Sequence, residues 1–332
     1  MSSRERVATA IARNDLDELI RISDDLASEC RWDDLLDLRD SARGAFEDTG
    51  RQLWPAASWA EYRVALHGRD DLMDEVLVPG TGMFAPGPLT EVAAQHHRWA
   101  SVATYLPEGP VAALFAHECA AHGEIIEETV VAADVLAVPL VRSMWEPEYL
   151  LATYTPTGIE TPSPVNPSAT RPIAPEVGEA LDDEDSAEAG NALRGVAENW
   201  ATQSEANIVV VAVAGNAANA IAACGIEREA RIAEISAQDG LRWLAWAGAS
   251  GGQRGRRRGA AAGRNAAWHA AAALCGFDPH EQVDQEELGE AIAELRWSWF
   301  GASDALVGHV VRLVIEDPVD GVAFAISAVD AP

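Results

Sequence analysis

The residues best suited to chemistry are six arginines in segment 240–277, which contains no acidic residue. Guanidinium groups bind phosphate and carboxylate through two parallel hydrogen bonds, so an arginine cluster is a natural anion site. Glycines recur through the same segment every four residues, in a chain whose formal net charge is −29. The arginines are Arg242, Arg254, Arg256, Arg257, Arg258 and Arg264, and the glycines are Gly251, Gly255, Gly259 and Gly263.

The glycine spacing predicts a loop over 248–255 that leads into a helix beginning near Arg256 or Arg257. Free backbone N–H groups and the positive end of the helix dipole attract anions at such a junction. The segment then predicts a low-molecular-weight anion site. Its candidate ligand-binding residues are Gly251, Gly252, Arg254, Gly255, Arg256, Arg257, Arg258 and Arg264.

The same residues also fit a purely structural role. Cationic side chains are unfavourable at a helix N-terminus, and the chain has 53 acidic residues that could pair with them internally. Small residues four apart let another helix approach closely. The sequence leaves both interpretations open.

Other motifs do not assemble into a catalytic or cofactor site. All 24 basic residues are arginine, and the absence of lysine excludes a P-loop, a kinase-type site and lysine-linked pyridoxal chemistry. His117 and His122 are five residues apart, about 140° around a helix, so they do not face one zinc ion. The turn at Gly215 lacks the other glycines of a dinucleotide motif, and Ser250 lacks the context of a nucleophile elbow. No cofactor and no metal are expected.

The elements that would position the arginines divide the chain into three parts. Residues 1–152 predict an all-α helical array, a bundle or an irregular solenoid, from repeated amphipathic stretches. Residues 153–190 predict a proline-rich and acidic linker. Residues 191–332 predict an α+β domain with about four strands and three long helices. The strands are expected at 207–214, 230–236, 309–315 and 322–329, and the long helices at 241–249, 257–275 and 285–299.

Composition limits the cellular context. A net charge of −29 argues against general binding of nucleic acid or anionic membranes. Neither a signal peptide nor an apolar run of about 20 residues is evident. Four scattered cysteines fit reduced thiols rather than a disulfide framework. We therefore expect a soluble cytoplasmic protein.

Several strings resemble an uncharacterised family of acidic, alanine-rich proteins from high-GC filamentous bacteria, known as a domain of unknown function. They are LAWAGASGGQRGRRRGAAAGRNAAWHAAAALCG, LTEVAAQHHRW, VAALFAHECAAHGE, LGEAIAELRWSWF and VRLVIEDPVDGVAFAISAVDA. The resemblance covers most of the chain except the proline-rich segment. It implies no activity, ligand or catalytic residue.

Three functions follow as hypotheses. The first is a soluble, non-enzymatic binding or scaffold protein whose partner, a protein or a small anionic ligand, is unknown, because no catalytic constellation is found and a helical array offers binding surface. The second is an enzyme or sensor that binds a phosphate- or carboxylate-bearing small molecule at 248–264. The third is a subunit of a homo-oligomeric assembly.

Overall fold

The fold is taken from a computed structural model that describes residues 2–50, 52–127, 135–226, 230–278, 283–302 and 308–331, apart from the side chains of 47–49. The chain divides into two units by the contacts between its residues. Met1–Val135 and Leu151–Thr161 make up the first, here called the helical unit. Leu136–Leu150 and Pro162–Pro332 make up the second, the sheet unit.

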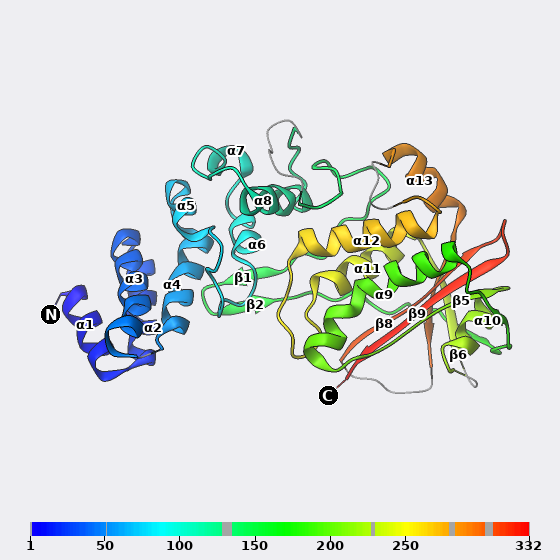
Figure 1. Ribbon diagram of the computed structural model, residues 1–332, viewed down its shortest axis with the longest axis horizontal. Helices are drawn as coiled ribbons and strands as arrows, with labels where there is room; N and C mark the ends of the chain where they lie inside the picture. The colour runs from blue at the N-terminus through cyan, green and yellow to red at the C-terminus, as the bar shows by residue number, and fades with distance from the viewer. Residues whose placement is uncertain are drawn as a thin grey trace. The chain divides into compact units, whose positions relative to one another are not determined.

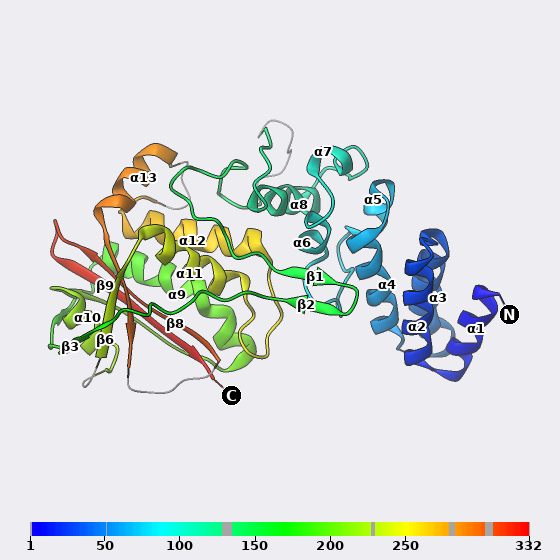
Figure 2. The same cartoon turned by 180° about the vertical axis from the view of Figure 1, so that it is seen from behind.

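The helical unit consists of helices that stack on one another in chain order, with a short hairpin (Figures 1 and 2). Amphipathic patterning and end signals form them, such as the capping box of Ser2 and Glu5. α4 is buried on most of its surface. This confirms that the N-terminal region is helical. The elements are α1 (Ser3–Arg13), α2 (Leu16–Ser28), α3 (Trp32–Thr49), α4 (Trp54–His67), η1 (Asp70–Leu72), α5 (Met73–Val76), α6 (Leu89–Ala94), α7 (Trp99–Val102), α8 (Pro110–Ala121), β1 (Thr153–Thr155) and β2 (Gly158–Glu160).

The sheet unit is built on an antiparallel sheet with the strand order β3-β6-β7-β8-β9-β5-β4. The central strands are rich in Val, Ile and aromatic residues, which suit a sheet covered on both faces. The mixed α and β composition expected for the C-terminal part is confirmed. Its elements are β3 (Arg171–Ile173), β4 (Glu179–Ala180), α9 (Glu184–Ser204), β5 (Asn207–Ala214), α10 (Ala217–Ala223), β6 (Ala230–Ile235), α11 (Ala237–Ala249), α12 (Ala260–Leu274), α13 (Gln285–Glu294), β7 (Arg296–Gly301), β8 (His309–Asp317) and β9 (Val322–Asp330).

The expected number of about four strands is wrong, because the described residues place seven in this sheet. β7 was expected as the end of a helix over 285–299, but that helix stops at Glu294. Trp299 instead lies between Ala233 of β6 and Leu313 of β8. The hydrogen-bonded pairing of β7 with both β6 and β8 favours a strand here, although the apolar residues have helical spacing.

The proline-rich stretch that precedes α9 supplies the remaining two strands. β3 and β4 are the outermost strands of the sheet. Pro172 lies in β3, where the missing N–H is tolerated because an edge strand needs donors on one side alone. Segment 153–190 also carries β1 and β2, which belong to the helical unit.

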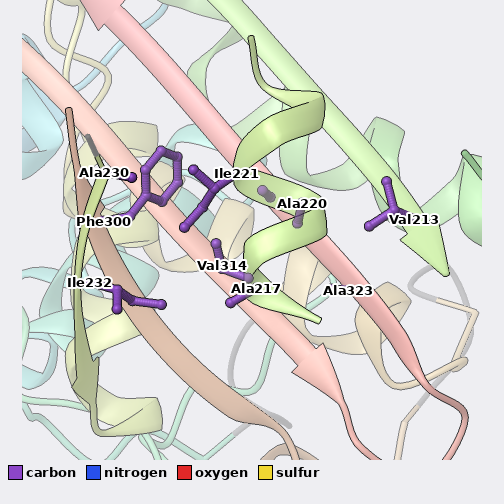
Figure 3. Packing of buried hydrophobic residues seen from close by; sticks show 10 residues of the cluster. Val213, Ala217, Ala220, Ile221, Ala230, Ile232, Phe300, Val314 and Ala323 are labelled. Atoms are coloured by element: carbon purple, nitrogen blue, oxygen red, sulfur yellow. The ribbon is translucent and has the colours of Figure 1, made fainter. Parts of the chain in front are cut away.

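Helices cover the two faces of the sheet differently. α10 packs on one face through Ile221, which meets Phe300 and Val314 in a buried apolar cluster (Figure 3). α9 and α11 cover the other face, where Val210 of β5 points towards Gly190 of α9. α12 lies outside this layer against α9 and α11 (Figure 1). This second layer carries the candidate site.

Candidate functional site

The backbone N–H groups of the loop between α11 and α12 donate hydrogen bonds to neighbouring parts of the chain, which fix the loop. The N–H of Arg254 donates to Oγ of Ser204 at 3.0 Å, and that of Arg256 to Oε1 of Gln203 at 2.9 Å. The N–H groups of Gln253 and Arg258 donate to the carboxylate of Asp330 and to the carbonyl of Ala249. These four donors are therefore occupied, and the loop is not an open cradle of N–H groups for an anion.

The loop glycines explain the tightness of this turn. A Cβ on Gly251 would lie 2.3 Å from the carbonyl oxygen of Arg256, and one on Gly255 would lie 2.1 Å from that of Gly251. Gly252 has a φ of +75°, which favours glycine. The glycines thus serve close backbone packing.

The helix after the loop begins later than the sequence predicts. α12 starts at Ala260, after Gly259 with a φ of +103°. The expected start at Arg256 or Arg257 is wrong, and the arginines precede the helix. Its first turn consequently holds alanines, which avoids placing cations at the positive end of the dipole.

The structure brings together the arginines of the loop but separates Arg264 from them. Arg254, Arg256 and Arg258 are exposed and Arg257 is half-buried. Arg256 and Arg257 already have interaction partners within the chain. Arg264 is fully buried in α12.

Arg264 is the centre of a buried ion pair. Its Nε and Nη2 each donate to a carboxylate oxygen of Glu146 at 2.7 Å. Its Nη1 donates to the carbonyl of Pro139 at 2.6 Å, and Tyr149 donates its hydroxyl to Glu146 at 2.5 Å. Burial raises the pKa of Glu146, but the hydrogen bonds and charge of Arg264 outweigh it and leave that pKa below its usual value. Arg264 therefore anchors segment 136–150 on α12.

Beside α12, the two helices α9 and α12 enclose a groove of about 310 Å³. The C-terminal end of α9 holds the loop that leads into α12, so the two helices run antiparallel along this groove. Both walls follow helical spacing, and small residues form much of the lining. α9 contributes Glu188, Asn191, Ala192, Gly195 and Val196, and α12 with its preceding loop contributes Arg258, Ala262, Asn265, Ala266 and His269.

The lining of this groove combines one cation with several other polar side chains. Oδ1 of Asn265 is buried and accepts no hydrogen bond from the described residues. A buried acceptor left without a partner is costly, so a donor group that reached it would be stabilised there. Arg258 supplies a cation, and the guanidinium takes part in no ion pair among the residues described. The volume lies at the lower end of the range of small-molecule sites.

Arg258 is the one candidate arginine in this groove. Glu188, Asn191, Asn265 and His269 were not identified from the sequence. On each helix the polar and small residues share one face, and this pattern was the available signal. It could not be recognised without knowing that α9 and α12 are neighbours.

A larger hollow of about 460 Å³ lies in the helical unit. Its lining includes Leu106, Ala113 and Ile126 together with Glu108 and Glu127. It is mainly apolar, and its charged lining residues are acidic. The groove of the sheet unit is the better candidate because it combines a cation with carboxamides.

Histidines gather in the helical unit. The rings of His67 and His96 lie 5.1 Å apart between centroids. Burial lowers the pKa of His67, His96 and His122. Electrostatic repulsion from His96 lowers the pKa of His67 further, whereas the carboxylate of Glu91 partly opposes the lowering at His122. No three metal-ligating side chains are grouped to hold an ion in the described part of the chain. Because their pKa values are lowered, the imidazoles of His67, His96 and His122 are mostly neutral near pH 7.

This arrangement predicts acid sensitivity of the helical unit. Histidines with lowered pKa values bind fewer protons in the folded state, so stability falls as the pH drops below the unfolded value of about 6.5. After correction for the pH dependence of the intrinsic exchange rate, the amides of α4 and α8 should exchange faster at pH 5.5 than at pH 7.5. The triple variant His67→Gln, His96→Gln, His122→Gln should weaken this dependence. An unchanged dependence in the variant would contradict the explanation.

The remaining features point to structural roles. Burial raises the pKa of Cys224 and of Cys275 to about 12, so both thiols are protonated and unreactive near neutral pH. Among the described residues, none of the helices is both long and apolar enough to cross a membrane.

A family model described as a family of unknown function, DUF6183, matches residues 17–305. No curated protein and no solved structure matches the chain. The matched range includes every residue that lines the groove between α9 and α12. The chain belongs to the DUF6183 family of unknown function.

Proposed function

We propose that the chain is a non-enzymatic binding protein that takes a small anionic ligand in the groove between α9 and α12. The observation that carries this proposal is the groove itself, in which Arg258 and Asn265 line one cavity of about 310 Å³. A guanidinium recognises a carboxylate or phosphate, and the carboxamide fixes the orientation of a donor group.

Binding is proposed rather than catalysis because of what lines the cavity. Its polar side chains are one arginine, one glutamate, one histidine and two asparagines. The lining contains no serine, cysteine or threonine as a nucleophile, and no grouped metal ligands. These residues suffice to hold and orient a ligand.

Thermal shift measurements test the proposal. At least one small anion from a panel of phosphate, succinate, glutamate and short peptides should raise the melting temperature in a concentration-dependent way, because it binds the folded state alone. Arg258→Gln and Asn265→Leu should remove the shift. Arg254→Gln is the matched control, since Arg254 is exposed on the same loop outside the groove. No shift with any anion, or equal shifts in all variants, would refute the proposal.

A further inference from the structure

The two charged ends of the groove lie far apart. Glu188 lies on the first turns of α9, whereas Arg258 lies just before α12. Because the helices run antiparallel, these residues are at opposite ends of the groove. The lining of α9 from Glu188 to Val196 extends about 12 Å along the helix axis at 1.5 Å per residue.

At this separation Glu188 and Arg258 cannot form an ion pair with each other. An ion pair needs the charged atoms within about 4 Å. Neither Glu188 nor Arg258 forms an ion pair among the described residues, and both side chains are exposed at the rim of the groove. The arrangement therefore favours a ligand that carries a cation at one end and an anion at the other.

Between the two charges the groove is suited to amide groups. Asn191 and Asn265 line the groove from opposite walls, and Oδ1 of Asn265 is a buried acceptor without a donor among the described residues. A backbone N–H of a peptide is such a donor. Ala192, Gly195, Ala262 and Ala266 leave room for a backbone with small side chains.

We infer that the groove binds a short linear peptide of about three small residues. The peptide carboxylate is bound by Arg258, its amino terminus by Glu188, and its amides by the two asparagines. An extended tripeptide spans about 10–11 Å, which matches the length of the groove. This inference rests on the proposed function and adds the class of ligand.

Isothermal titration with Ala-Ala-Ala and its end-blocked forms tests the inference. N-acetylation and C-amidation should each weaken binding about tenfold or more, because each removes one charge-assisted contact. Ala-Ala should bind more weakly than Ala-Ala-Ala, since it cannot reach both ends. In Glu188→Gln, acetylation should no longer weaken binding, whereas amidation still should. In Arg258→Gln, amidation should no longer weaken binding, whereas acetylation still should.

The controls are Glu198→Gln on α9 and Arg254→Gln on the loop, both exposed and outside the groove lining. Both should retain the two penalties. If acetylated peptide binds as well as the free peptide, the inference is wrong. If succinate or phosphate binds at Arg258 and the tripeptide does not, the inference is again wrong but the proposed function stands. If none of these compounds and no other anion of the panel binds, both are overturned.

Discussion

Arg264→Ala is expected to lower the free energy of unfolding of the sheet unit by about 3–5 kcal/mol, the usual cost of breaking a buried ion pair. The substitution leaves the carboxylate of Glu146 buried, and it removes the donors that hold the carbonyls of Pro139 and Val141. Chemical denaturation followed by tryptophan fluorescence measures the change. Segment 136–150 should also lose protection from proteolysis.

A double variant and a control distinguish the contribution of the buried charges from that of side-chain packing. Arg264→Met with Glu146→Gln removes both charges at similar volume and should be less destabilising than Arg264→Ala. Arg242→Met is the control, because Arg242 pairs with Asp239 near the surface and should contribute less than about 1 kcal/mol. A loss below about 1 kcal/mol in Arg264→Ala would show that the pair does not anchor the segment.

Gly263→Ala is the second substitution with a large expected effect. A Cβ at this position would lie 2.2 Å from the carbonyl oxygen of Ala245 and 2.8 Å from Cβ of Ala249, both in α11. Backbone atoms cannot yield without separating the helices, so we expect a loss of about 1–3 kcal/mol despite the better helix propensity of alanine.

Gly195→Ala is the matched control in the same unit. No atom lies within 4 Å of a Cβ built on Gly195. There the same substitution should stabilise the protein by up to about 1 kcal/mol, because alanine favours the helix interior. Denaturation curves of the two variants should shift in opposite directions. A gain in stability for Gly263→Ala would mean that α11 and α12 do not pack as closely as described.

These predictions assign different roles to a segment that looked uniform in sequence. The glycine steps at Gly251, Gly255 and Gly263 serve close packing, and Arg264 serves an internal ion pair. Arg258 is left at the groove, where binding is proposed. The structural role therefore applies to these glycines and to Arg264, whereas a binding role is proposed for Arg258 alone.

The sequence by itself determined the elements that have a clear local pattern. Amphipathic spacing gave the helical character of the N-terminal region, and β-branched runs gave β5, β6, β8 and β9 at nearly their observed bounds. The absence of lysine excluded lysine-linked pyridoxal chemistry, and the spacing of His117 and His122 excluded a zinc ion held by both on one helix. These inferences rest on properties of neighbouring residues, which a single sequence displays.

The tertiary structure decided what depends on distant partners. β7 is a strand because β6 and β8 lie beside it, and β3 and β4 exist through pairing with strands elsewhere in the chain. The groove required α9 and α12 to be neighbours, and the role of Arg264 required Glu146, 118 residues away. Burial, ion pairing and cavities arise from contacts between remote segments. The physical reason is that these contacts, unlike helix or strand periodicity, leave no local pattern in the chain.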